Sequence, residues 1–79
     1  MKTELVEERD NIYLLSLIFK SKPSRALLDL VKTVFSGELS LNKEIRKHKP
    51  DMELLEILNY QIKRNRVEFF VSLKKSQVW

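Results

Sequence analysis

The sequence predicts one mainly α-helical (α+β) domain, with a core of three helices, an extra N-terminal helix and a short C-terminal strand. Three observations lead to this fold class. The 79 residues make one domain at most, because domains usually have about 100–150 residues. One glycine and two prolines are too few for the many tight turns of an all-β fold. Apolar residues recur at helical spacing over most of the chain.

The N-terminal segment, residues 1–22, is predicted to be a helix that mediates homodimerisation. Thr3 can cap this helix, and the acidic residues of its first turn oppose the positive end of the helix dipole. Residues 12–19 are apolar nearly all round, which is typical of a helix buried within a protein or against another subunit. The alternative is a core helix wrapped by the rest of the chain. The predicted dimer contacts are Ile12, Leu15 and Phe19.

The remaining segment, residues 23–79, is predicted to be the helical core. A second helix spans about 23–36 and ends before Gly37, because glycine suits the left-handed position that follows a helix. A short third helix covers about 40–48 and is held mainly by its neighbours, since it carries few apolar residues. After a proline turn, Asp51 caps a fourth helix.

The C-terminal segment allows two interpretations. Apolar residues occupy the odd-numbered positions of 67–73, and this period of two predicts a strand. Alternatively, one helix continues over 51–75 and gives an all-α four-helix bundle with a long C-terminal helix. If the strand forms with its odd-numbered residues inside, Phe70 points outward and becomes an interface candidate.

Residues 24–73 resemble the winged helix-turn-helix superfamily. Residues 39–45 (LSLNKEI) look like the linker strand and the opening of that family's second helix. Residues 57–58 and Ile62 look like buried positions of its third helix, and 65–69 (NRVEF) looks like the turn into the wing. The resemblance therefore implies a winged-helix core with a regulatory, nucleic-acid-binding role.

This resemblance implies that the helix beginning at Asp51 enters the major groove of DNA, while the wing contacts the backbone. Asn59 would lie on the exposed face of that helix, where an amide can read adenine edges. Glu53 and Glu56 depart from the family pattern, because carboxylates on that face would be repelled by phosphates. Many winged helices instead bind proteins, and an acidic face suits that role.

The leading hypothesis is a non-enzymatic regulator that binds DNA or another nucleic acid, and the positive charge of the chain permits such binding. The formal net charge is +4, and cations are densest over 43–49 and 63–66. The two clusters form one phosphate-binding surface only if they lie together in the fold. The alternative is an ordinary solvent-exposed surface, in which the lysine and arginine stems cover apolar neighbours. The predicted nucleic-acid-binding residues are Lys43, Arg46, Lys47, Lys49, Asn59, Lys63, Arg64 and Arg66.

The alternative function is a helical protein–protein interaction module, such as an inhibitor, an immunity factor or an assembly adaptor, that binds no nucleic acid. Its predicted contact residues combine the acidic face of the fourth helix with exposed aromatic rings. They are Glu56, Tyr60 and Phe70.

Several classes of protein receive no support from the sequence. The chain has no cysteine, and His48 is its sole histidine, so neither a disulfide nor a metal site is expected. No glycine-rich phosphate loop, nucleophile motif or cofactor fingerprint occurs, and we expect no catalytic residue and no cofactor. The longest apolar run is far shorter than the ~20 residues that span a bilayer, and the acidic N-terminus is unlike a signal peptide. We therefore expect a cytoplasmic protein.

Overall fold

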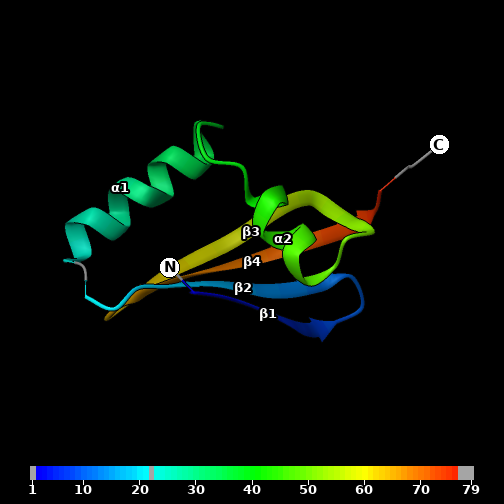
Figure 1. Ribbon diagram of the computed structural model, residues 1–79, viewed down its shortest axis with the longest axis horizontal. Coiled ribbons are helices and arrows are strands. Elements are labelled where there is room, and N and C mark those ends of the chain that lie inside the picture. Colours follow the sequence, from blue (N-terminus) through cyan, green and yellow to red (C-terminus); the bar gives the residue numbers. More distant parts are fainter. Residues whose placement is uncertain (1, 22, 77–79) are drawn as a thin grey trace.

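The fold is a four-stranded antiparallel sheet with two helices on one of its faces (Figure 1). This computed structural model describes residues 2–21 and 23–76. The strand order is β1-β2-β4-β3, so β2 and β4 are central and β1 and β3 are the edges. Two hairpins thus flank a pair of helices in the chain. The elements are β1 (Lys2–Arg9), β2 (Ile12–Ile18), α1 (Ser24–Phe35), α2 (Leu41–His48), β3 (Met52–Lys63) and β4 (Arg66–Lys75).

The predicted mainly α-helical fold is wrong, and so is its all-α alternative. Strands make up 50% of the structure and helices 27%. The segment predicted as an N-terminal helix forms the hairpin β1–β2, and the predicted fourth helix is the strand β3. The chain therefore lacks a winged-helix core in its described part, and the resemblance to the winged helix-turn-helix superfamily does not hold. The helices predicted over about 23–36 and 40–48 are confirmed as α1 and α2, and the predicted C-terminal strand lies within β4.

The first hairpin forms because Asp10 and Asn11 supply its turn. Asn11 has a φ of 63°, a left-handed conformation that asparagine tolerates better than most residues. In β2, Tyr13, Leu15 and Leu17 are buried and point into the core. On the other face of the strand, Ile12, Leu14 and Ile18 are also apolar, which is why the segment looks like a helix that is apolar nearly all round.

Strand β3 contains two bulges, which give its sequence a helical appearance. Register shifts fall between Leu54 and Glu56 and between Ile57 and Asn59. Each shift leaves one extra residue, so Leu54, Ile57 and Tyr60 all pair with core residues of β4 at a spacing of three. A spacing of three resembles the period of a helix more than that of a strand, so the sequence alone suggested the wrong element.

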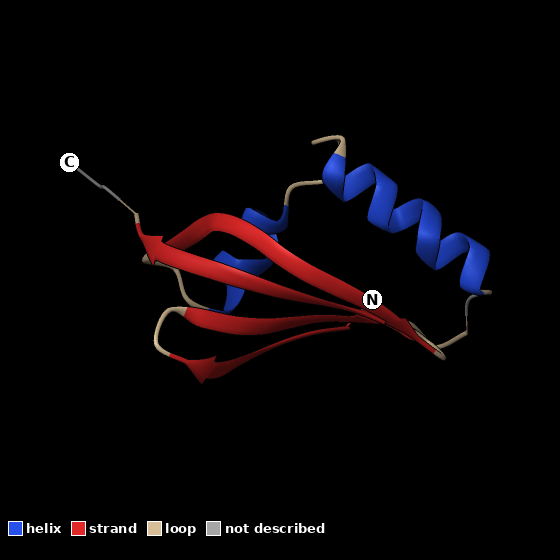
Figure 2. Cartoon of the chain, turned by 180° about the vertical axis from the view of Figure 1, so that it is seen from behind, coloured by secondary structure: helices blue, strands red, loops and turns tan. Residues whose placement is uncertain are grey.

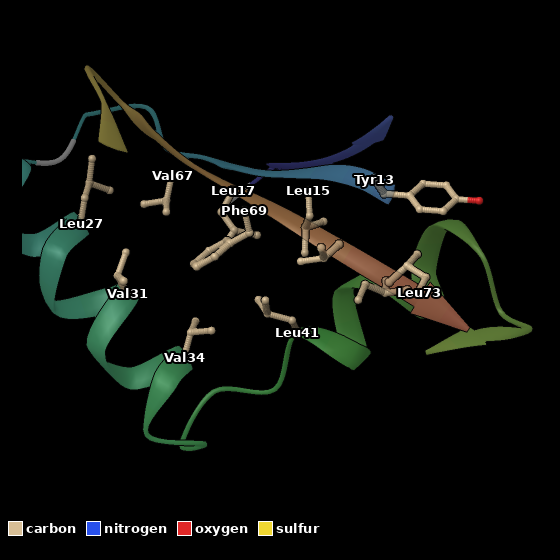
Figure 3. Packing of buried hydrophobic residues seen from close by; sticks show 12 residues of the cluster. Tyr13, Leu15, Leu17, Leu27, Val31, Val34, Leu41, Val67, Phe69 and Leu73 are labelled. Carbon is tan, nitrogen blue, oxygen red and sulfur yellow. The ribbon is translucent and has the colours of Figure 1, made fainter. Parts of the chain in front are cut away.

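Both helices pack on the same face of the sheet (Figure 2). Apolar residues of α1 and α2 meet the inward-facing residues of the two central strands (Figure 3). Phe69 is fully buried at the middle of this layer. The side chain of Asn42, in α2, accepts a hydrogen bond from the backbone N–H of Leu54 (2.6 Å), which ties α2 to the start of β3.

The opposite face of the sheet, here called the open face, carries no helix of the described chain. The strand register places its side chains in rows across the sheet. One row is mainly apolar and consists of Val6, Leu14, Phe70 and Asn59. Another row, at the end of the sheet near the β3–β4 turn, is basic and consists of Lys2, Ile18, Arg66 and Lys63. No described helix is long and apolar enough to cross a membrane.

Candidate functional site

Exposed apolar side chains concentrate on one flank of the molecule, where α1 lies beside β3. Monomeric soluble proteins rarely leave such groups together unless the surface binds something. Among the described residues, five of the six exposed large apolar side chains belong to these two elements, and the sixth is Val6 of β1. We call these five residues the α1–β3 seam. They are Leu28, Phe35, Leu55, Leu58 and Tyr60, with exposed fractions of 39%, 56%, 60%, 47% and 38%.

The bulges of β3 and the end of α1 create this seam. Leu55 and Leu58 are the extra residues at the two bulges, where a side chain leaves the regular alternation of the strand. Tyr60 belongs to the helix side of the sheet, and its ring meets that of Phe35 edge to face with centroids 5.8 Å apart. The Tyr60 ring also lies 6.4 Å from Phe69, so the seam joins the core.

The outer side of β3 faces no other strand of the described chain, because β3 is an edge of the sheet. An exposed, long and apolar edge is a template for pairing with another strand. Residues 57–62 of β3 carry no charge, whereas the other edge, β1, carries five charged residues among its eight. Charged side chains discourage edge pairing, so β3 is the edge suited to a partner.

The charges of the β3 segment are divided between its ends. Asp51, Glu53 and Glu56 lie at its beginning, and Lys63 and Arg64 lie at its end. Glu53 is shared by two cations, the guanidinium of Arg46 (3.6 Å) and the ammonium of Lys74 (3.5 Å). The middle of the strand is therefore an uncharged stretch between an acidic end and a basic end.

The second candidate surface is a hollow lined by lysines at the end of the sheet near the β3–β4 turn, here called the basic hollow. Its volume is about 480 Å³, and its apolar wall is formed by Ile18 and Phe19. Lys2, Lys20 and Asn65 complete the lining. The backbone N–H of Phe19 donates to the carbonyl of Asn65 at 2.8 Å, which fixes the β3–β4 turn against the end of β2.

Part of the positive charge around this hollow is neutralised by a buried glutamate. Glu68 lies on the open face with 5% of its side chain exposed, and it binds Lys63 at 3.1 Å and Arg66 at 3.7 Å. It also accepts a hydrogen bond from the Gln61 side chain at 2.6 Å. Among the described residues, Lys2, Lys20 and Arg64 have no carboxylate within 4.0 Å, so their charges remain available to an anion.

The cations of α2 lie in a different part of the molecule from the basic hollow. Lys47 pairs with Glu44 of its own helix (3.2 Å), and the Lys49 ammonium sits over the Tyr13 ring, 5.7 Å from its centroid. Exposed Lys43 and the Arg46–Glu53 pair complete this cluster. The twelve residues of β3 separate α2 from the 63–66 turn, which is about 36 Å along an extended strand. The structure thus does not bring the two basic clusters together as one surface.

The other predicted contact residues are also dispersed. Ile12 lies on the open face, Leu15 is fully buried in the core, and Phe19 lines the basic hollow. Asn59 lies on the open face, and its side-chain oxygen accepts the backbone N–H of Tyr60 (2.8 Å).

Of the residues predicted for the alternative protein interface, Glu56 and Phe70 lie in neighbouring rows of the open face. Tyr60 lies on the helix side, within the α1–β3 seam. Phe70 points away from the core, as expected if residues 67–73 form a strand.

Sequence reasoning missed the residues that define both surfaces. The sequence alone does not predict that Leu28, Phe35, Leu55 and Leu58 are exposed, although the Leu54-Leu55 and Ile57-Leu58 doublets interrupt a strand pattern where a bulge can form. Lys2 and Lys20 were also missed. They reach one end of the sheet only because residues 10–11 reverse the chain.

The described residues include no group of three or more histidine, cysteine or acidic side chains placed to hold a metal ion. His48 Nε2 lies 3.0 Å from Thr3 Oγ1, which links the end of α2 to β1. No protein-family model matches the chain, and the searches of curated proteins and of solved structures found no match either.

Proposed function

We propose that this chain is a non-enzymatic protein-interaction module that works in the cytoplasm and binds its partner along the α1–β3 seam. The observation that carries the proposal is the concentration of exposed apolar side chains on α1 and on β3, an edge strand whose residues 57–62 carry no charge. A homodimer, which the sequence predicts through a different segment, residues 1–22, would be one form of this interaction.

The geometry favours addition of a strand from the partner. Backbone groups along β3 can extend the sheet by main-chain hydrogen bonds, and side-chain pockets beside the edge then provide specificity. Leu58 and Tyr60 flank the edge, and Phe35 stands above it from α1, so an added strand would cover all three. Aromatic and apolar anchors in such a position commonly dominate binding energy.

Selection of random linear peptides on the purified chain tests this proposal. Peptides with alternating apolar residues should be enriched, unless a second copy of the chain already occupies the seam. Leu58→Asp places a carboxylate in the seam and should weaken binding of the peptides, or of the second copy, at least about tenfold. Val6→Asp is the matched control, because Val6 is similarly exposed on the opposite edge.

Both variants must keep their circular dichroism spectrum and cooperative unfolding for the comparison to hold. If Val6→Asp weakens binding and Leu58→Asp does not, the partner binds elsewhere on the sheet. If the unmodified chain binds neither peptides nor a second copy, the proposal fails.

A second candidate function, nucleic-acid binding, is favoured by the basic hollow. Lys2 and Lys20 line the hollow and offer unpaired charges to phosphates, while Phe19 and Ile18 offer an apolar wall to a base. Arg64 precedes the lining residue Asn65 in the chain and adds a third unpaired charge nearby. This candidate site lies at the 63–66 turn of the predicted nucleic-acid surface and does not include the cations of α2.

Fluorescence anisotropy with a labelled mixed-sequence oligonucleotide, single-stranded and duplex, tests this candidate. We expect binding to weaken as salt rises, with a log–log slope of about −3 or steeper, because three or more phosphates would be contacted. Lys20→Glu should reduce the affinity and flatten the slope, whereas Lys75→Glu, at the far end of β4, should change both less. No binding at low salt, or equal effects of the two variants, would rule out a phosphate site at this hollow.

A further inference from the structure

We infer that the partner of the α1–β3 seam is a second copy of this chain, whose β3 pairs antiparallel with β3 of the first across a two-fold axis. This inference rests on the proposed function, since it names the partner for the same surface. It would join two four-stranded sheets into one continuous eight-stranded sheet with the α1 helices on the same side.

The distribution of charge along the β3 segment makes the strand complementary to itself. A two-fold axis through the middle of β3 places the acidic beginning of one strand across from the basic end of the other. Asp51, Glu53 and Glu56 of one copy then approach Lys63 and Arg64 of the second copy. A parallel arrangement would instead bring like charges together, which destabilises a strand pair.

The faces of the two strands also match in this arrangement. If the two bulge residues are left out of the count, successive side chains of β3 point alternately to the helix side and to the open face of the sheet. Every register whose two-fold axis passes through a residue keeps directly opposed side chains on one face, and two such registers are centred at the middle of β3. An axis at Asn59 pairs Lys63 with Glu53 of the second copy, and an axis at Tyr60 pairs Lys63 with Glu56.

The aromatic residues of the seam provide the apolar centre of the interface. Each copy presents a Tyr60 ring in contact with Phe35, and both rings are more than one-third exposed. Either axis brings the two Tyr60–Phe35 pairs close together above the joined sheet. Edge-to-face contacts between such rings add about 0.5–1.5 kcal/mol beyond the area they bury. The copies therefore gain main-chain pairing, charge pairing and an aromatic cluster together.

Single-cysteine cross-linking tests this arrangement, because the chain has no cysteine and every disulfide must join two copies. A residue on a two-fold axis opposes itself at a Cα–Cα distance of about 5.5 Å in a hydrogen-bonded pair and about 4.5 Å in a non-hydrogen-bonded pair, and a disulfide can span either distance. Under mild oxidation we expect Asn59→Cys or Tyr60→Cys to form covalent dimers, and the more efficient of the two identifies the register. Val6→Cys, exposed on the β1 edge, is the control and should form no covalent dimer.

Cross-linking at neither position, together with a monomeric mass at all concentrations, would overturn the inference. Peptide binding separates this failure from that of the proposed function. If the chain is monomeric but binds peptides in a Leu58-dependent manner, the seam binds a different protein. If it binds neither, both the inference and the proposed function fail. Cross-linking of Val6→Cys instead would assign the dimer to β1.

Discussion

Phe69 and Phe70 are adjacent in the sequence but lie in opposite environments. Phe69 is fully buried under the helices, beside Leu15 of the neighbouring strand, whereas Phe70 lies on the open face. The difference follows from the alternation of a strand, in which successive side chains point to opposite faces. A comparison of the two residues therefore shows which face of β4 is turned toward the helices.

Truncation of the two rings should have unequal effects. Phe69→Ala should lower the free energy of unfolding by about 3–5 kcal/mol, because it leaves a cavity at the centre of the core. Phe70→Ala should cost less than about 2 kcal/mol, because the ring is only partly covered. Chemical denaturation measures both values. A larger loss for Phe70→Ala would mean that β4 faces the helices with its other side.

At the scale of elements, the hairpin β1–β2 depends on its two-residue turn. Asn11 adopts a left-handed conformation, φ 63°, which a β-branched side chain tolerates poorly. We therefore expect Asn11→Val to destabilise the fold by about 1–3 kcal/mol. Asn11→Gly should leave the stability unchanged or increase it, since glycine adopts this conformation freely. Thermal unfolding compares the two, and an equal loss in both variants would show that the Asn11 side chain, not its backbone angle, matters.

The sequence predicted some elements well because their signals are local. Helix α1 has a single buried stripe and is bounded by Pro23 and Gly37, and β4 alternates without interruption. The hairpin β1–β2 was predicted as a helix because residues 12–19 are apolar on both faces. Strand β3 was predicted as a helix because its bulges change the spacing of core residues, and bulges form only against the neighbouring strand.

The candidate sites were less predictable than the elements. Phe70 could be placed at the surface, since its environment follows from the alternation of β4. The contribution of Leu58 could not be foreseen, because its exposure results from a bulge and from the position of β3 at the edge of the sheet. The separation of the α2 cations from the 63–66 turn also follows only from the topology.

At the scale of the whole molecule, the helices cover one face of the sheet and leave distinct surfaces at its sides. A chain of this size buries only roughly 60–65% of the surface of its unfolded form, so its own core is small. Pairing two copies along β3 would bury the α1–β3 seam and remove two sheet edges at once. The same pairing does not involve Lys2 and Lys20, which line the hollow, whereas Arg64 would pair with the second copy and no longer be available to a phosphate.

The most direct test of the shared seam is the molar mass in solution, measured by light scattering over a range of concentrations. We expect dimers for the unmodified chain and for Val6→Asp, and monomers for Leu58→Asp at the same concentrations. Monomers in all three cases, or dimers that persist in Leu58→Asp, would contradict the pairing of two copies along β3.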